Sequence, residues 1–247
     1  MKKYFPLFWV FYLLCAFSAH AGEGRYTIPL TGGGWSLWLD KEASWQNDRL
    51  YLPHEITDLS LLPVNVPTGG WQTLSHNPDA VPVEVPGTVE EYLTVTDNPR
   101  PENFRGVSWW YRKITIPADQ QKKRFIIYFE SVRMRAEVYL DGKLVAYDLI
   151  GETPFHVDIT DEAKPGKEQL LAIRVTNPGG NFHWQDFDIM KWGEYNIPPS
   201  RSFTGIIGRV KLESVNPVFI SDIYMQNTPE LTKVNACLLY TSPSPRD

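Results

Sequence analysis

The sequence predicts an all-β jelly-roll sandwich, and three observations support this prediction. Short runs of β-branched and aromatic residues recur between Gly22 and Ser214, separated by Pro, Gly, Asn and Asp. Runs with a helical period are almost absent from the same range. Aromatic residues make up 13% of the chain, which suits strands buried on one face, because Trp and Tyr supply large core area.

The first expected strands are GGGWSLWLD (32–40) and VPVEVPG (81–87). The segment between them, 41–80, is rich in polar residues and contains four prolines. Proline and polar clusters are typical of loops. We therefore expect a long insertion loop here, with room for one short helical turn.

The next predicted strands are more regular. In SWWYRKITIP (108–117), side chains alternate between two faces, and we interpret Trp109, Trp110 and Tyr111 as core residues. RFIIYFESV (124–132) is nearly continuous in apolar residues, as expected for a strand covered on both faces.

The clearest local signal is AEVYLDGKLVAYD (136–148), where Asp141-Gly142 stands between two apolar runs. This dipeptide suits a type I′ hairpin, because both turn residues need positive φ. QLLAIRVTN (169–177) and GRVKLESV (208–215) also alternate, and they complete the predicted sandwich.

Residues 1–21 resemble a secretory signal peptide. Lys2 and Lys3 precede an apolar run that ends near Ala19-His20-Ala21. The run is shorter than the about 20 residues of a membrane span. A lipid anchor at Cys15 is the alternative, but Leu14 is bulky for the residue before a lipidated cysteine. We expect a soluble exported protein, periplasmic or extracellular, with no membrane partner after signal cleavage.

Residues 22–214 are predicted to form the jelly roll, and 215–236 the start of a truncated second, immunoglobulin-like sandwich. VFISDIYMQN (218–227) is expected to be its first strand, with no partner in the rest of the chain. The last segment, CLLYTSPSPRD (237–247), matches the translation of a transposase-type sequencing adapter in one frame. We therefore interpret it as an artefact and expect the natural protein to continue beyond Ala236.

Composition limits the partners and the means of stabilisation. If both ends are removed, no cysteine remains, so an exported domain of roughly 200 residues must rely on its core. The formal net charge of −5 argues against nucleic acid, which requires a basic patch.

No nucleophile-elbow, zinc-protease, P-loop or dinucleotide motif is present, and the histidines are scattered. The remaining candidates for chemistry are the carboxylates Asp186, Asp188 and Glu194 in NFHWQDFDIMKWGEY (181–195). Paired carboxylates can act in glycoside hydrolysis, but any acidic loop meets that spacing test. We expect no complete active site here and no cofactor; calcium or sodium would suit carboxylate-rich loops, but no ligand spacing supports either.

The order of motifs resembles the N-terminal sugar-binding domain of glycoside hydrolase family 2, which includes β-galactosidases and β-glucuronidases. The stretches that carry this resemblance are VEVPGTVEEY (83–92), GVSWWYRKITIP (106–117), AEVYLDGKLVAYD (136–148), TPFHVDIT (153–160), QLLAIRVTN (169–177) and FTGIIGRVKLE (203–213). Asp141, Ala146 and Gly208 depart from the family pattern. These departures concern the subfamily rather than the fold.

The resemblance implies a jelly roll, an immunoglobulin-like sandwich and a (β/α)₈ barrel that carries both catalytic glutamates. No catalytic residue is then expected in this fragment, which would be inactive alone. The implied partner is the chain's own missing barrel, and the implied chemistry is retaining hydrolysis of a carbohydrate. The sugar, the linkage and the oligomeric state are not indicated.

In β-galactosidases of this family, the loop before the last jelly-roll strand carries an aspartate into the barrel's pocket. WQDFDIMKW (184–192) lies at the corresponding place, with Asp186 the best match and Asp188 the second. The full set of predicted substrate-binding residues is Asn181, His183, Trp184, Asp186, Asp188 and Trp192. Each also has a structural interpretation, because tryptophans fill cores and aspartates stabilise turns.

Two functions therefore remain at this point. One is the pocket-completing module of a secreted glycosidase whose barrel lies outside this sequence. The other is a stand-alone carbohydrate-binding or adhesion module without hydrolase activity.

Overall fold

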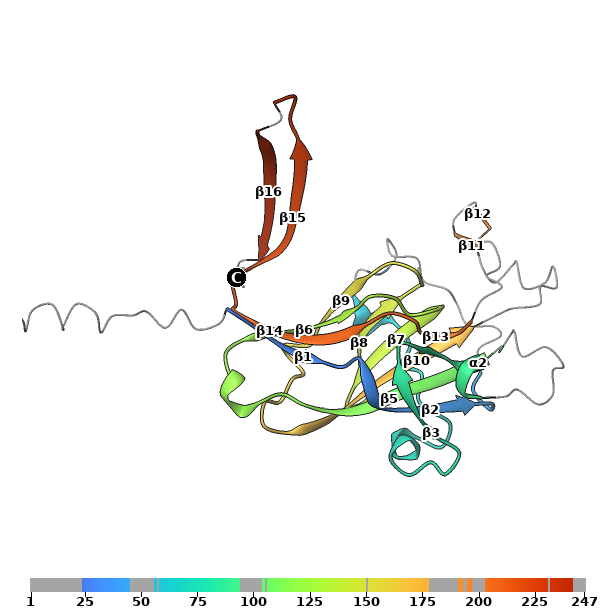
Figure 1. Cartoon of the computed structure of the whole chain (residues 1–247). Helices are drawn as coiled ribbons and strands as arrows, with labels where there is room; N and C mark the ends of the chain where they lie inside the picture. The colour runs from blue at the N-terminus through green and yellow to red at the C-terminus, as the bar shows by residue number, and fades with distance from the viewer. Residues whose placement is uncertain are drawn as a thin grey trace, which may run out of the picture.

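The computed structural model describes residues 24–44, 56, 58–93, 104, 106–149, 151–177, 203–230 and 232–239, and the backbone of 191–192, 195–196 and 240–241. Within these ranges, antiparallel strands form a jelly-roll sandwich of two sheets (Figure 1). The predicted fold class is confirmed. No helix in the described ranges is long and apolar enough to cross a bilayer.

The two sheets differ in size. The smaller has the order β1 (Arg25–Pro29), β14 (Val210–Val215), β6 (Arg124–Phe129) and β9 (Phe155–Asp158). The larger has the order β3 (Val81–Val85), β2 (Gly32–Asp40), β5 (Gly106–Thr115), β10 (Glu168–Asn177), β7 (Arg135–Leu140) and β8 (Lys143–Asp148). A short pair, β4 (Gly87–Thr88) with β13 (Gly205–Ile206), lies at one end of the sandwich (Figure 1).

The main core lies between the sheets and follows the alternation read from the sequence. Trp110, Ile173 and Val138, on neighbouring strands β5, β10 and β7, are completely buried there. Ile127 and Phe129 of β6 face them from the smaller sheet. The indole N–H of Trp110 donates to the Ser108 hydroxyl at 3.2 Å, so this large side chain is buried with its polar atom satisfied.

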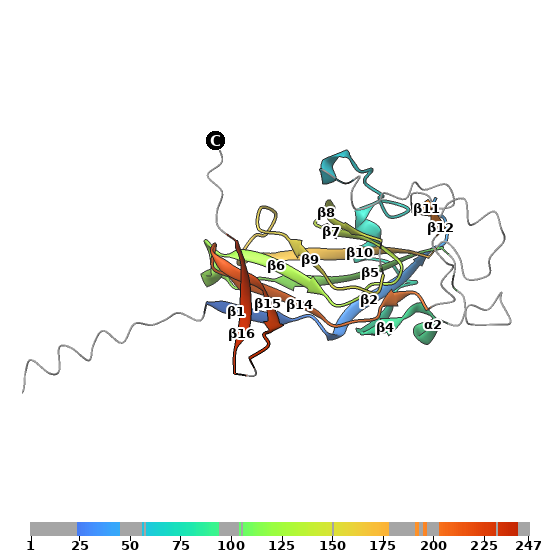
Figure 2. The same ribbon diagram turned by 90° about the horizontal axis from the view of Figure 1, so that it is seen from above.

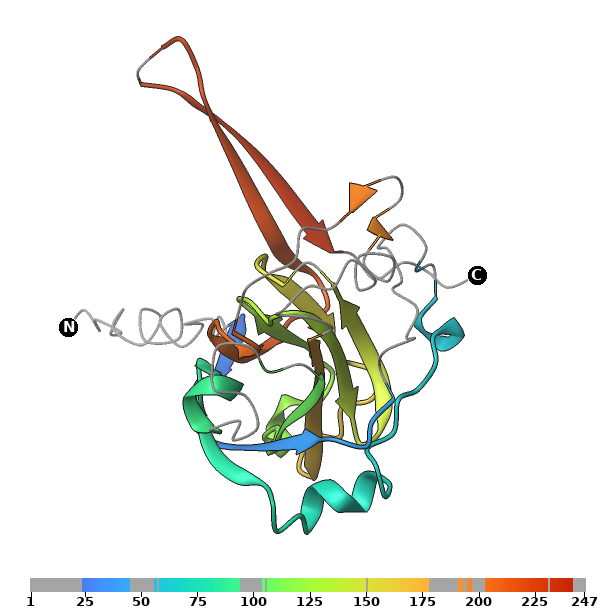
Figure 3. The ribbon, with the colours of Figure 1, turned by 90° about the vertical axis from the view of Figure 1, so that its right-hand side faces the viewer.

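A second core covers the outer face of the larger sheet. Trp109 and Tyr139 point outward from β5 and β7, and Trp71 packs on both at ring-centroid distances of 5.6 and 5.0 Å. Trp71 begins the 3₁₀ helix η3 (Trp71–Ser75), within the insertion at 41–80. Another 3₁₀ helix of the insertion, η2 (Leu59–Leu61), lies beside β8 (Figure 3). The insertion is therefore a cover for the sheet, and its described part holds two short helical segments where one was expected.

Two local signals explain the turns. Asp141 and Gly142 have φ values of 48° and 83°, as the predicted type I′ hairpin between β7 and β8 requires. The single helical turn α2 (Val89–Tyr92) begins at Thr88, whose hydroxyl accepts from the Glu91 N–H at 3.1 Å. Thr-Val-Glu-Glu has the spacing of a capping box, a helix signal that the β-rich interpretation did not use. A further 3₁₀ turn, η4 (Ala118–Gln120), follows β5.

The expectation that residues 218–227 lack a partner is wrong. β15 (Phe219–Asn227) pairs with β16 (Val234–Thr241), so strand structure extends into the segment interpreted as an adapter. The run Cys237 to Thr241 contains β-branched, aromatic and aliphatic residues, which suits a strand. The hairpin projects away from the sandwich (Figures 1 and 3), and the apolar side chains of Ile223 and Tyr224 are exposed. The domain boundary and the origin of the last segment stay predictions.

Candidate functional site

The six residues predicted to bind sugar all belong to the segment between β10 and β13. Trp192 is the second residue of β11 (Lys191–Trp192) and lies opposite Tyr195 in β12 (Tyr195–Asn196). The other five lie outside the described residues: Asn181, His183, Trp184, Asp186 and Asp188. Their roles stay predictions. What the structure describes is the base of this segment, at the end of the sandwich that carries α2, β4 and β13 (Figures 1 and 2).

Asn177 connects the two sides of that base. It is the last residue of β10, and it is completely buried. Its side-chain amide donates to the Phe104 carbonyl at 2.7 Å and to the Thr204 hydroxyl at 2.5 Å. Residue 177 precedes the segment and residue 204 follows it, so one buried amide joins the point where the chain leaves the sandwich to the point where it returns.

Glu90 of α2 completes this base from the other side. Its two carboxylate oxygens accept from the Phe104 and Thr204 backbone N–H groups, both at 3.1 Å. Burial raises the pKa of Glu90, and these backbone hydrogen bonds oppose that rise. The backbone N–H of Val89 also donates to the Thr204 carbonyl at 2.7 Å. We call Glu90, Phe104, Asn177 and Thr204 the clasp.

A charged network lies on the outer face of the larger sheet, near the same end. Arg174 of β10 donates to the Glu137 carboxylate of β7 at 3.1 Å, and Arg135 lies 3.4 Å from the same oxygen. Both arginines and Glu137 are almost completely buried. Tyr139 and Asn65 donate to the remaining positions on the carboxylate, at 2.7 and 2.9 Å. Burial, followed by the charge of Glu137, raises the pKa of Tyr139, so its hydroxyl stays a donor.

Asp40 extends the polar cluster toward β2. One of its carboxylate oxygens accepts from the Trp109 indole at 3.1 Å and from the Thr68 N–H at 2.9 Å. The Arg174 guanidinium also donates to the Ser44 carbonyl at 3.1 Å. Insertion residues at 44, 65 and 68 therefore bond directly to side chains of the sheet. These polar groups therefore hold the insertion in place over the sheet.

Chemically, this arrangement fixes the backbone at the start and at the end of the segment. The described carboxylates at this end accept from several donors each, and in the described ranges no three His, Cys, Asp or Glu side chains could together hold a metal ion. Sequence reasoning missed Glu137, Arg174, Glu90 and Asn177. Polar residues on one parity of a strand normally indicate a solvent-facing side. For Glu137 and Arg174, the signal that could have found them is the long proline-containing insertion, because a cover over that side would bury them.

Comparisons with known proteins match this description. A sequence profile described as the sugar-binding domain of family 2 glycosyl hydrolases matches residues 32–197. A β-glucuronidase of Formosa agariphila is 31% identical over 118 residues, which cover 48% of this chain and 12% of the relative. A β-galactosidase of Thermoanaerobacter pseudethanolicus is 32% identical over 124 residues, covering 50% of this chain and 16% of the relative.

Solved structures agree on the fold. A β-glucuronidase of Ruminococcus gnavus superposes with a TM-score of 0.61 over 90% of this chain and 35% of that chain, at 19% identity. A β-glucuronidase of an uncultured Clostridium species superposes with a TM-score of 0.59 over 99% of this chain and 36% of that chain, at 19% identity. The present chain thus spans about a third or less of the length of each of these four proteins.

Proposed function

Because this chain belongs to the sugar-binding domain family of the family 2 glycosyl hydrolases, we propose that it completes the substrate pocket of a longer, exported glycosidase. The observation that carries this proposal is the extent of the profile match, 32–197, which runs from β2 into the segment after β10. The clasp gives that segment a fixed start and end, as a pocket-lining loop requires.

The proposed division of labour follows from the chemistry of glycoside hydrolysis. Two glutamates of a barrel outside this sequence would act as nucleophile and as acid–base in a retaining reaction. Asp186, with Asp188 as the second candidate, would accept charge-assisted hydrogen bonds from sugar hydroxyls. Trp184 or Trp192 would pack against the apolar face of a sugar ring. The proposed substrates are β-glucuronides or β-galactosides, the classes that the names of the relatives indicate.

The first experiment is recovery of the gene from source DNA. We expect an open reading frame that continues past codon 236 into a barrel domain, and a full-length product that hydrolyses an aryl β-glucuronide or an aryl β-galactoside. Mass spectrometry of the exported product should show a mature N-terminus at about residue 22, as signal cleavage requires. A natural stop codon with no barrel would instead leave a stand-alone binding module.

The role of the loop carboxylate has its own test. In the full-length enzyme, Asp186→Asn should lower kcat/KM by roughly 10- to 100-fold, the size expected for a lost charged hydrogen bond. Asp119→Asn, in η4 at an exposed position, is the control and should leave kcat/KM unchanged. If Asp188→Asn shows the loss and Asp186→Asn does not, the assignment moves to Asp188.

A further inference from the structure

A groove of about 650 Å³ opens on the outer face of the larger sheet, away from the clasp. β2 and β5 contribute Ser36, Tyr111 and Lys113, and the insertion contributes residues 74–78. Leu170 of β10 also lines it, seven residues before Asn177. At about 3.3 Å per strand residue, the groove lies roughly 23 Å along β10 from the clasp. Its volume falls within the about 300–1,000 Å³ of known small-molecule sites.

The walls combine apolar surface with a few polar groups, as saccharide sites require. Leu74, Pro78 and Pro82 supply apolar surface, and the ring of Tyr111 is buried beside them. Burial raises the pKa of Tyr111 against the effect of its hydrogen bond with Ser36, so the hydroxyl stays neutral. Apolar walls suit the C–H faces of sugar rings, while hydroxyl groups suit their polar edges.

The charge of the groove has one sign. Lys113 and His76 line it, and none of its described lining residues is acidic. Arg112 also borders the groove, but its side chain lies on the other face of β5, where it donates to the Leu30 carbonyl at 2.9 Å and lies 5.3 Å over the buried Trp35 ring.

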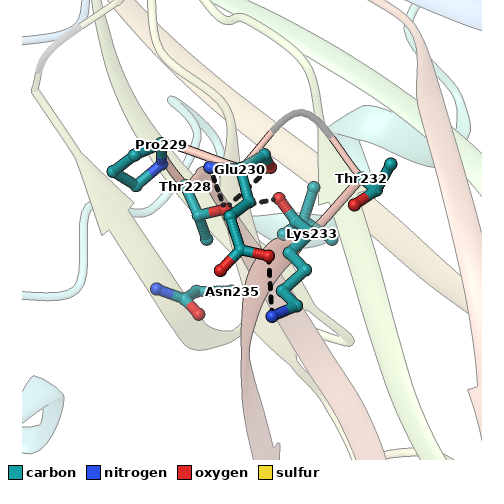
Figure 4. A pocket seen from close by; sticks show the side chains of 7 residues that line it. Thr228, Pro229, Glu230, Thr232, Lys233 and Asn235 are labelled. Carbon is teal, nitrogen blue, oxygen red and sulfur yellow. Dashed lines mark hydrogen bonds and ion pairs between the residues drawn. The ribbon is translucent and has the colours of Figure 1, made fainter.

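The side chain of Lys113, unlike that of Arg112, is exposed on the outer face of the sheet. It pairs with Glu168 at 2.7 Å, but both side chains are more than half exposed. An exposed pair of this kind contributes little to stability, so the lysine can exchange its partner for a ligand at small cost. A second hollow, at the turn between β15 and β16, contains a similar pair, Lys233 with Glu230 at 2.7 Å (Figure 4). That hollow is lined by one turn and includes the acidic Glu230, so it lacks the excess of cations.

We propose that the groove is a second saccharide site and that it binds an acidic oligosaccharide through Lys113 and His76. That the ligand is a saccharide rests on the proposed function, whereas its negative charge is inferred from the groove alone. The groove would bind one part of a charged polysaccharide while another part of the same polysaccharide reaches the end of the sandwich that carries the clasp. Two linked contacts of this kind raise the effective concentration of substrate without any new catalytic group.

Isothermal titration of the full chain tests this proposal with two matched probes. A β-1,4-linked glucuronate tetramer carries carboxylates, and cellotetraose has the same backbone without them. We expect the tetraglucuronate to bind in the millimolar range, at least about tenfold more tightly than cellotetraose, and to weaken as salt is added. Absence of tetraglucuronate binding, or equal binding of both probes, would overturn the proposal.

Two variants test whether tetraglucuronate binds in this groove. The double variant His76→Ala with Lys113→Gln changes exposed side chains, and it should reduce tetraglucuronate affinity by about tenfold while circular dichroism stays unchanged. Lys233→Gln removes an equally exposed, equally paired lysine elsewhere and should leave the affinity unchanged. Equal losses in both variants would indicate nonspecific attraction and refute the site. Hydrolysis of a small aryl glycoside by the full-length enzyme should be unaffected by the groove variants, so failure of this proposal is distinguishable from failure of the glycosidase assignment.

Discussion

The two ends of strands β5 and β10 use polar side chains in opposite ways. At the Asn177 end, charged and amide groups are buried and bonded to each other, as in the Glu137–Arg174 pair and the clasp. At the Leu170 end, Lys113 of β5 and Glu168 of β10 form an exposed pair beside an open groove. The same two strands therefore carry a structural polar cluster at one end and an accessible one at the other.

The difference between the two ends shows which polar groups are free to bind a ligand. Burying a polar group without partners costs several kcal/mol at most sites, so buried groups are committed to their hydrogen bonds. A group beside an open groove keeps water as an alternative partner and can exchange it for a ligand. Mutations at the two ends should thus separate into large effects on stability and large effects on binding.

The largest expected effect is at the Asn177 end of the sheet, which we call the closed end because its polar groups are buried. Glu137→Ala removes the acceptor shared by Arg174, Arg135 and Tyr139, and it leaves buried cations beside the gap. Breaking a buried pair by removing one partner typically costs about 3–5 kcal/mol. Urea unfolding followed by fluorescence should show this loss. Glu168→Ala, which removes the exposed partner of Lys113, is the matched control and should change stability by less than about 1 kcal/mol.

A glycine beside the clasp gives the next largest effect. A Cβ on Gly205 would lie 2.3 Å from the Gly87 carbonyl oxygen and 2.9 Å from the Trp110 ring, so the β4–β13 pair would have to move. Gly205→Ala should therefore destabilise the fold by about 1–3 kcal/mol, measured by the same urea titration. Gly33→Ala is the control, because the nearest atom to its added Cβ is a Glu84 oxygen at 3.9 Å. Equal stability of the two variants would contradict this prediction.

The main sandwich could be predicted because apolar residues alternate with polar ones along its strands and because turn residues separate the strands. Val138 and Leu140 both point into the core, and Asp141-Gly142 forms the hairpin turn. Both features can be predicted from the local sequence without knowing the partner strand. The hairpin β15–β16 was missed for a different reason. Residues 237–241 of its second strand belong to the segment interpreted as an artefact, and that interpretation excludes them as a partner for β15.

The polar cluster could not be predicted from any single segment. Glu137 and Arg174 meet only because β7 and β10 are neighbours, and they are buried only because the insertion covers that face. The clasp likewise joins residues 90, 104, 177 and 204, which are distant in the sequence. Long-range pairing of this kind has no local sequence signal. The substrate-binding assignments in 181–192 stay predictions, because they rest on resemblance.

The clasp also predicts a dependence on pH. Burial raises the folded-state pKa of Glu90 above its ordinary value of 4.5, so the native state holds that proton more tightly than the unfolded state. Stability from this group is then highest below 4.5 and falls as the pH rises toward the raised pKa. The stability of the natural chain relative to Glu90→Gln should decrease over that interval, measured by urea titration at several pH values.

The smallest expected effect on stability is at the Leu170 end of the sheet, which we call the open end. It tests most directly whether the two ends of the sheet use polar side chains differently. Lys113→Gln removes one partner of a pair in which both side chains are more than half exposed. Solvent screens such a pair, so unfolding free energy should change by less than about 1 kcal/mol. Lys233→Gln, with the same pair distance, should behave alike. A loss comparable to that of Glu137→Ala would mean that Lys113 is structural, and the distinction between the closed and open ends of the sheet would fail.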